Sequence, residues 1–211
     1  ESEDERMLSV FQAGRDIHDD AALEIFGKGY TDEERKKAKS VNFLTVYGGG
    51  AGTLSFKFKV KYEEAQDWLY KHRRTYKKLY QWTAKQHLQA KHHGWVESRF
   101  GTLRRFPEIV NADEEQTARI LRQAGNFPIQ SQGAIINNLS AITLDKALKE
   151  KGYKSLLILQ VHDNLVLDTL KKEYNQIKRI AVQIMTRDIM KECPWLKVDL
   201  PVDEKFGERW E

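Results

Sequence analysis

Four side chains with the chemistry to bind a nucleotide recur at every fourth position in one stretch of the sequence. They are two cations followed by two rings: Arg35, Lys39, Phe43 and Tyr47. Residues four apart lie on one face of a helix, so the four form a single stripe. Arginine and lysine donate to phosphate oxygens, and a flat ring packs on a sugar or a base. The stripe therefore suits a nucleoside triphosphate lying along the helix; a solvated basic face is the plainer alternative.

A lone carboxylate lies between two apolar runs near the end of the chain. Asp163 is the only acidic residue between Leu156 and Leu167, and it follows His162 directly. The runs favour two buried strands, and a carboxylate at their turn is costly unless a cation meets it. A divalent ion such as Mg²⁺ would do so, because it prefers carboxylate oxygens. The alternative is an ordinary turn, where aspartate and asparagine are common.

A third set of polar side chains recurs at steps of four, at Arg122, Asn126 and Gln130. Guanidinium and amide groups on one face can donate to purine N3 and pyrimidine O2 in the minor groove. Those acceptors occur at every base pair, so such contacts test the shape of a pair without reading its identity. The alternative is an ordinary polar helix face, and Pro128 is expected to interrupt the helix.

The elements that must position these residues follow from periodicity and stop signals. Helices are expected at about residues 7–14, 17–26, 31–47, 62–90, 112–124, 129–149 and 174–191. The helix of the stripe opens with a capping box of Thr31 and Glu34, and it closes at Gly48, where glycine permits another backbone to approach. Strands are expected in a hairpin over 94–106, in a second hairpin at 156–161 and 165–167, and at 198–202. This pattern predicts the α+β class, mostly helical with a small antiparallel sheet.

The composition of the 211 residues sets wider limits. The formal net charge is +4 and the pI is about 9.0, a balance that mildly favours a polyanionic partner. With one cysteine, Cys193, the chain can build no disulfide and no cysteine-type zinc site, and a reducing compartment fits best. The sequence has no signal peptide and no apolar run of membrane-spanning length, so we expect a soluble, intracellular protein without a membrane partner.

In their order and spacing, these motifs resemble those of family A DNA polymerases, the DNA polymerase I type. The resemblance is carried by Arg35 to Gly48, similar to the helix of the family's fingers; Gly94 to Pro107; Arg122 to Gln130, similar to its minor-groove helix; and Leu159 to Asp163, similar to the catalytic motif of its palm. Asp16-Ile17-His18 and the closing segment Pro201 to Trp210 fit as well. The resemblance covers essentially the whole chain.

The resemblance implies a role for each residue of the stripe. Arg35 and Lys39 would hold the triphosphate of an incoming dNTP, and Lys39 would be the acid for the leaving pyrophosphate. Phe43 would pack on the sugar, and Tyr47 would lie at the insertion site beside the templating base. Closure of this helix over a correct base pair would select the nucleotide.

The resemblance also implies contacts with primer-template DNA and Mg²⁺. Arg122, Asn126 and Gln130 would follow the minor groove, and His162 would support the primer terminus. Asp163 would bind metal in a two-metal site, where Mg²⁺ ions about 4 Å apart stabilise the attacking and leaving oxygens. The primer 3′-oxygen would attack the α-phosphorus of the dNTP. We therefore expect template-directed DNA synthesis by a nucleotidyltransferase.

By the same resemblance, residues 1–14 would be a palm-side helix, 15–92 the fingers and 93–211 the C-terminal part of the palm, an incomplete right-hand architecture. The family's thumb and its other metal-binding aspartate, in an Asp-Tyr-Ser type motif, are not found in this sequence. We therefore expect a truncated fragment or half of a split polymerase. A second chain or an N-terminal segment would then be needed for activity.

One position departs from the family's pattern: Asn164 stands where the family usually has glutamate. An amide lacks the charge that a carboxylate brings near the metals, so we expect weaker metal affinity or a changed pH dependence. Two other functions stay open. A single-subunit RNA polymerase has a similar His-Asp turn, and a non-catalytic DNA-binding subunit could keep the fold without the chemistry. We expect the protein wherever its DNA is replicated, and a viral or plasmid source stays open.

Overall fold

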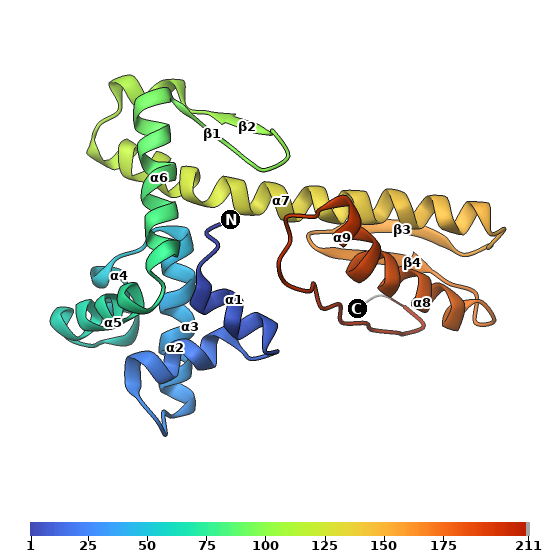
Figure 1. The fold of residues 1–211 in the computed structure, drawn as a ribbon, viewed down its shortest axis with the longest axis horizontal. Helices are drawn as coiled ribbons and strands as arrows, with labels where there is room; N and C mark the ends of the chain where they lie inside the picture. Colours follow the sequence, from blue (N-terminus) through green and yellow to red (C-terminus); the bar gives the residue numbers. More distant parts are fainter. Residues whose placement is uncertain (210–211) are drawn as a thin grey trace. The chain divides into compact units, whose positions relative to one another are not determined.

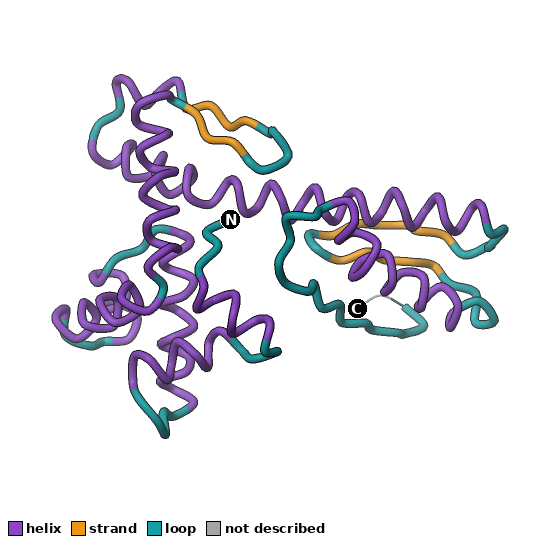
Figure 2. The backbone as a smooth tube through the Cα atoms, in the orientation of Figure 1, coloured by secondary structure: helices purple, strands orange, loops and turns teal. Residues whose placement is uncertain are grey.

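The computed structural model describes residues 1–209, mostly as helices, with two small antiparallel sheets in this part of the chain (Figures 1 and 2). The helices are α1 (Glu5–Gln12), α2 (Ile17–Phe26), α3 (Asp32–Tyr47), α4 (Ala51–Phe58), α5 (Tyr62–Thr75), α6 (Lys77–His93), α7 (Glu114–Glu150), α8 (Tyr174–Gln183) and α9 (Ile189–Glu192). A 3₁₀ helix, η1 (Pro107–Asn111), precedes α7, and a π-helical turn, η2 (Ile184–Asp188), joins α8 to α9. The strands are β1 (Trp95–Glu97), β2 (Leu103–Arg105), β3 (Leu156–Val161) and β4 (Asn164–Asp168). The predicted α+β class is confirmed.

The chain divides into two compact units, Glu1–Gln132 and the part that begins at Gly133. Helix α7 begins in the first unit and ends in the second. Each unit has a hydrophobic core of its own. The subdomain limits expected at residues 14 and 92 follow the family's fingers and palm, and they stay a prediction.

The main core of the first unit is formed by α2, α3, α4 and α5. Fully buried alanines let the helix backbones approach closely: Ala21, Ala22, Ala38 and Ala65. Larger side chains such as Val41, Leu54 and Trp68 fill the remaining space, and each contributes about 1.5–3 kcal/mol by its burial. Because Ala38 and Val41 face this core, α3 turns its opposite face toward solvent.

The helix that carries the stripe begins and ends as its sequence predicts. The Thr31 N–H donates to Glu34 Oε2 at 2.7 Å, and the Glu34 N–H donates to Thr31 Oγ1 at 3.2 Å, so the capping box is confirmed. At the other end Gly48 has φ +78°, a left-handed conformation that glycine adopts without strain. Both ends of α3 are thus set by local residues.

The single helix predicted over 62–90 is wrong, because the chain breaks at Tyr76 into α5 and α6. Asp4, which is distant in the sequence, favours this break because it caps the start of α6. Its Oδ2 accepts from the Lys78 N–H at 2.9 Å. The same carboxylate also caps α1 by accepting from the N–H groups of Arg6 and Met7. One aspartate therefore begins two helices that lie far apart in the sequence.

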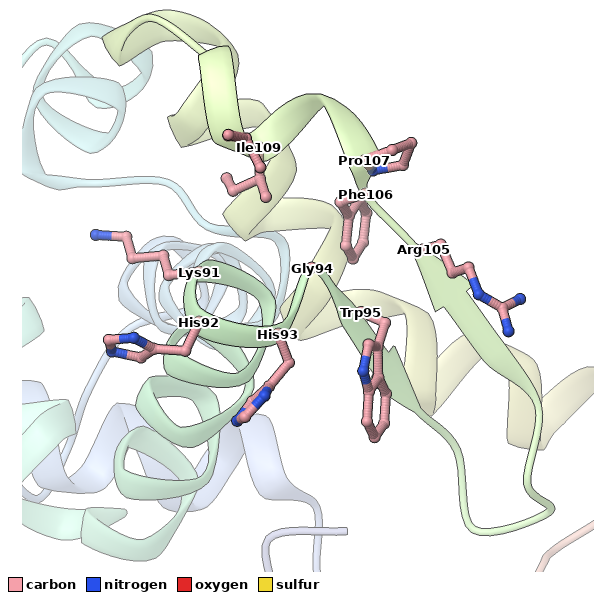
Figure 3. A pocket seen from close by; sticks show the side chains of 10 residues that line it. Lys91, His92, His93, Gly94, Trp95, Arg105, Phe106, Pro107 and Ile109 are labelled. Carbon is pink, nitrogen blue, oxygen red and sulfur yellow. The ribbon is translucent and has the colours of Figure 1, made fainter.

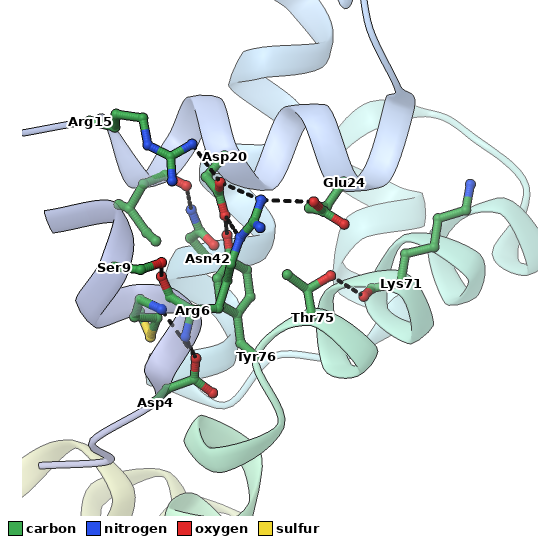
Figure 4. A network of polar contacts seen from close by, with 12 residues as sticks. Asp4, Arg6, Ser9, Arg15, Asp20, Glu24, Asn42, Lys71, Thr75 and Tyr76 are labelled. Carbon is green, nitrogen blue, oxygen red and sulfur yellow. Dashed lines mark hydrogen bonds and ion pairs between the residues drawn. The ribbon is translucent and has the colours of Figure 1, made fainter. Parts of the chain in front are cut away.

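An ion-pair network around the buried Asp20 fixes the position of Tyr76 (Figure 4). Asp20 is 4% exposed and receives two hydrogen bonds from the Arg6 guanidinium, at 2.9 and 2.8 Å. The Tyr76 hydroxyl donates to the same carboxylate at 2.9 Å, and Glu24 takes a further bond from Arg6 at 2.9 Å. Burial raises the pKa of Tyr76, which therefore keeps the proton that it donates.

The first hairpin and the start of α7 share a second core in this unit. β1 pairs with β2, with Val96 opposite Arg104, and the predicted hairpin is confirmed. Val96 and Phe106 pack with Ile120 of α7. The interruption expected at Pro128 is wrong, because α7 continues through this residue. Pro128 is fully buried, and its packing offsets the backbone hydrogen bond that a proline cannot make.

In the second unit, α7 and α8 cover one side of the β3–β4 hairpin. Leu144 and Leu148 of α7 pack with Ile177 of α8 and with Leu165 and Leu167 of β4. The strands pair antiparallel with Val161 opposite Asn164, which confirms the second predicted hairpin. The expected helix over 174–191 is confirmed as far as α8, and the π turn η2 then continues it into α9.

Two further segments differ from the prediction. Helix α4 was not expected, and it forms because Leu54 and Ala51 complete the core against α5. The strand expected at 198–202 is wrong, since this segment has no regular structure and pairs with no strand in the described part of the chain. The closing segment's end at Trp210 lies outside the described residues. None of the described helices is long and apolar enough to cross a membrane.

Candidate functional site

The stripe lies on the solvent-facing side of α3, in the first unit. Phe43 is 46% exposed and Tyr47 is 48% exposed, and their rings stack with centroids 6.2 Å apart. Lys39 places its ammonium 5.8 Å from the centre of the Phe43 ring. The two neighbouring rings form an exposed aromatic patch on a helix whose other side packs on the core. The predicted face therefore exists as a surface of rings and cations.

Arg35, at the beginning of the stripe, is held by two carboxylates from α2 and its cap. Its Nη2 lies 2.6 Å from Asp16 Oδ2, and its Nε donates to Asp19 Oδ1. The hydrogen bond from Arg35 to Asp19 raises the pKa of Arg35 further. A phosphate that binds Arg35 in this conformation must therefore compete with two acidic side chains.

Asp16 has a structural role as well, because it caps α2. Its Oδ1 accepts from His18 N–H at 2.6 Å and from Asp19 N–H at 3.3 Å. Burial works to raise the pKa of the Asp16 carboxyl, but these two backbone donors and the charge of Arg35 outweigh it and lower the pKa. Asp16 is therefore ionised at neutral pH beside the first cation of the stripe.

His18 lies beside the stripe, although the sequence did not identify it as a site residue. Its ring centroid is 5.6 Å from that of Phe43, and its Nδ1 is 2.9 Å from Asn42 Nδ2. Burial lowers the pKa of His18; Asp16 opposes this effect, and Lys39 and Arg35 reinforce it. The signal in the sequence was the segment Asp16-Ile17-His18, which fits the family but carries no spacing that links it to α3.

The predicted minor-groove residues lie on the first half of α7. Arg122, Asn126 and Gln130 occupy one continuous helix, so their steps of four place them on one face. Arg122 and Gln130 are exposed and Asn126 is half-buried. A Cβ added at Gly48 would overlap the Arg122 side chain, so the end of α3 lies directly against this face. Another segment does approach Gly48 closely, as expected, but it does so through the Arg122 side chain and not through its backbone.

The turn of the second hairpin carries His162 and Asp163. His162 has φ +54°, which costs a residue other than glycine about 1 kcal/mol. Asn137 of α7 donates to the His162 carbonyl at 3.0 Å, and Asn164 donates to Asp163 Oδ1 at 3.4 Å. The turn is thus held by amides rather than by charges.

The expectation that Asp163 ends two buried strands is wrong. Asp163 is exposed, and so are Leu156 and Ile158 of β3, at 57% each. Leu165 and Leu167 of β4 pack on the core of α7 and α8, whereas four of the six β3 residues are exposed. A solvated carboxylate has no need of a metal, so burial supplies no argument for one here.

The residues present fit a divalent metal only in part. Asp163 offers carboxylate oxygens of the kind that Mg²⁺ prefers. Within residues 1–209, however, no group of three or more histidine, cysteine, aspartate or glutamate side chains is placed to hold a metal ion. Asp163 can therefore be one ligand of a metal but forms no complete site with these neighbours.

A cavity of about 400 Å³ lies between the end of α6, the β1–β2 hairpin and η1 (Figure 3). Basic and aromatic side chains line it, among them Lys91, His93, Trp95 and Arg105. Figure 3 shows Lys91 and Arg105 extending in opposite directions, so their charges do not converge. The cavity lacks the focused charge that a phosphate needs, and none of the predicted site residues lines it.

Comparison with known proteins supports the polymerase interpretation. The sequence model of DNA polymerase family A matches residues 1–211. The thermostable DNA polymerase I of Thermus aquaticus is 32% identical over 212 residues, which are 99% of this chain and 25% of that protein. DNA polymerase I of Caldicellulosiruptor bescii is 34% identical over 212 residues, 99% of this chain and 24% of that protein.

A solved structure has the same fold. The POL domain of Pol1 from M. smegmatis, in complex with DNA primer-template and dNTP, superposes with a TM-score of 0.86 and 26% sequence identity. The match covers 95% of this chain and 35% of that one. The chain spans about a quarter of the length of the curated relatives that it matches.

Proposed function

Because the chain belongs to DNA polymerase family A, we propose that it supplies the fingers and the C-terminal part of the palm in template-directed DNA synthesis. The fingers are residues 15–92, and residues 93–211 belong to the palm. The observation that carries the proposal is the exposed face of α3, where cations and stacked rings follow one another at helical spacing. That order matches the order of phosphate, sugar and base in a dNTP.

The stripe binds the incoming dNTP. Arg35 and Lys39 donate to the triphosphate, Phe43 packs on the sugar, and Tyr47 lies beside the templating base. Arginine binds phosphate in a fork and lysine as a point charge, so the pair holds several oxygens at once. Lys39 then gives a proton to the pyrophosphate as it leaves.

The exposed face of α7 follows the minor groove of the primer-template duplex. Arg122, Asn126 and Gln130 carry the donors that purine N3 and pyrimidine O2 accept. Since these acceptors have the same place in every correct pair, the contacts test pairing without preferring a sequence. The approach of Gly48 to Arg122 joins this face to the end of the stripe and supports a role for both in one site.

The second hairpin supports the reaction centre. His162 holds the primer terminus, and Asp163 provides a carboxylate to the Mg²⁺ that family A DNA polymerases generally use. Bound Mg²⁺ supplies charge stabilisation to the attacking and leaving oxygens. The residues of this chain chiefly bind and orient the reactants, so placement dominates their contribution.

The chain acts together with a further polypeptide segment. The family's thumb and second metal-binding aspartate are not found in its sequence, and the curated relatives are about four times as long. The site of action is wherever the DNA is replicated. The isolated chain therefore binds dNTP but does not extend a primer.

Primer extension tests the proposal. The chain is assayed alone and after mixing with a thumb-bearing polypeptide from the same source, on a primer-template with dNTPs and Mg²⁺. We expect extension only from the mixture, and its loss in Asp163→Ala. Asp168→Ala is the matched control, an exposed carboxylate on the same hairpin that should leave extension intact.

The outcomes separate the competing functions. Extension by the mixture that needs rNTPs would favour an RNA polymerase. DNA binding with no extension in any mixture would favour a non-catalytic subunit. Extension by the isolated chain would overturn the proposed division of the site.

A further inference from the structure

Four side chains from four helices form one line of hydrogen bonds beneath the stripe. Asn42 of α3 lies between two imidazoles: its Nδ2 is 2.9 Å from Nδ1 of His18 on α2, and its Oδ1 is 2.6 Å from Nε2 of His72 on α5. The line reaches Tyr80 of α6, whose hydroxyl is 3.0 Å from His72 Nδ1 and 3.2 Å from Thr45 Oγ1. His18 lies at one end of this line, beside Phe43.

One backbone carbonyl determines where every proton in the line resides. The Ile17 carbonyl oxygen lies 3.3 Å from Asn42 Nδ2, and a carbonyl can only accept. The end of the Asn42 amide that faces His18 is therefore the NH₂ group, and His18 Nδ1 must accept from it. A neutral imidazole whose Nδ1 accepts carries its proton on Nε2.

The other end of the amide gives a consistent result. Asn42 Oδ1 can only accept, so His72 carries its proton on Nε2 and donates it. His72 Nδ1 then accepts from the Tyr80 hydroxyl. Each donor in the line meets an acceptor, and no other arrangement of the protons satisfies the Ile17 carbonyl as well.

Burial keeps this arrangement in place at physiological pH. His72 is 1% exposed, and burial lowers its pKa to about 4, so it stays neutral. A charged His72 would need a proton on Nδ1 and would lose the bond from Tyr80. The line is therefore rigid on the side that faces the core.

We infer that Asn42 and His72 are positioning residues that hold His18 beside the stripe as the tautomer with its proton on Nε2. His18 then presents an N–H donor, rather than a lone pair, to a ligand of the stripe. An N–H donor suits the oxygens of a phosphate. The use of this donor by a triphosphate rests on the proposed function, but the tautomer itself does not.

Nitrogen NMR of the ¹⁵N-labelled chain tests the inference, because long-range correlations distinguish protonated from bare ring nitrogens. In the unmodified chain at neutral pH we expect His18 and His72 with protons on Nε2 and bare Nδ1. A His18 proton on Nδ1 would overturn the inference, and this measurement needs no variant to fold.

Variants test the direction of the effect. Asn42→Asp replaces the NH₂ by an acceptor of the same shape, so we expect a proton to move onto His18 Nδ1. Asn42→Ala should lower the ratio of the two tautomers by about fivefold, the value of one typical hydrogen bond. An unchanged His18 spectrum in a folded Asn42→Asp variant would contradict the inference.

Substitutions of His72 separate positioning from simple packing. His72→Gln keeps an N–H near the place of Nε2 and should preserve the His18 tautomer, whereas His72→Leu fills the space without a donor and should lose it. His92→Gln, an exposed residue on α6, is the control. Equal tautomer populations in the Gln and Leu variants would overturn the role of His72.

A ligand titration keeps the two proposals distinct. Inorganic tripolyphosphate, added to the labelled chain, should shift the His18 Nε2 signal and leave His92 unchanged. If the tautomer is as inferred but tripolyphosphate shifts nothing, the positioning of His18 stands and the proposed dNTP site fails.

Discussion

The backbone of Gly48, at the end of α3, lies directly against the side chain of Arg122 on α7. A Cβ at position 48 would overlap the Arg122 side chain, and Gly48 also needs φ +78°. The residue that ends the stripe helix thus contacts the first of the proposed minor-groove residues. Although Gly48 and Arg122 are 74 residues apart in the sequence, the end of the stripe and the proposed minor-groove face are neighbours in the fold.

Substitution of Gly48 should therefore be costly. Gly48→Ala combines a left-handed backbone with a steric overlap, and we expect a loss of about 1–2 kcal/mol in the free energy of unfolding. Urea unfolding followed by circular dichroism measures this loss. Gly50→Ala is the control, since Gly50 has φ −119° and no atom near its absent Cβ. Equal losses in the two variants would refute the contact.

The carboxylates around Arg35 should limit phosphate binding. Asp19→Asn weakens the competition for the guanidinium, and we expect dNTP affinity to rise about two- to fivefold, as for an exposed ion pair. A fluorescent dNTP titration at low salt measures the affinity. Asp67→Asn, which removes a charge from the Asp67–Lys71 pair on α5, should change it little. A fall in affinity in Asp19→Asn would show that this carboxylate supports the site.

Asn164 should set the metal requirement of the reconstituted polymerase. Asn164→Glu adds a carboxylate beside Asp163, to which Asn164 now donates a hydrogen bond at 3.4 Å. We expect primer extension by the variant to reach half its maximum at a lower Mg²⁺ concentration than the parent. Asn164→Gln, which adds length without charge, should not do so. If primer extension by the parent and by Asn164→Glu depends on the Mg²⁺ concentration in the same way, Asn164 does not set the metal requirement.

His72 should make the fold sensitive to acid. Its pKa is about 4 in the folded chain, and an unfolded histidine has a pKa near 6.5, so below that value the unfolded state binds a proton that the folded state excludes. Stability is therefore full above pH 6.5 and is lost as the pH falls toward 4. Between pH 7 and 4.5 the loss from this group is on the order of 2–3 kcal/mol.

Urea unfolding at both pH values measures this loss. His72→Gln should remove most of it, because the glutamine does not titrate. His92→Gln, at an exposed position on α6, should keep the full dependence. A parent protein whose stability is the same at pH 7 and 4.5 would contradict the burial of a neutral His72.

Local signals in the sequence were sufficient for most of the elements. The capping box at Thr31 and the glycine at position 48 bound α3, and two apolar runs form the β3–β4 hairpin. Such features depend on neighbours within a few residues, so they can be predicted from the sequence alone. The stripe is predictable for the same reason, because helical spacing alone aligns its side chains.

Contacts between distant segments decided the rest. No local signal in the sequence shows that Asp4 caps α6 or that α7 continues through Pro128. The exposure of Asp163 at the end of β3 has no local signal either. The line from His18 to Tyr80 likewise needs four helices, because each of them supplies one of its four side chains. The sequence determines which side chains lie on one face of a helix. Their burial and their hydrogen-bond partners come from other elements. Only the tertiary structure therefore decides which of these side chains are charged, which are neutral and which are held in place.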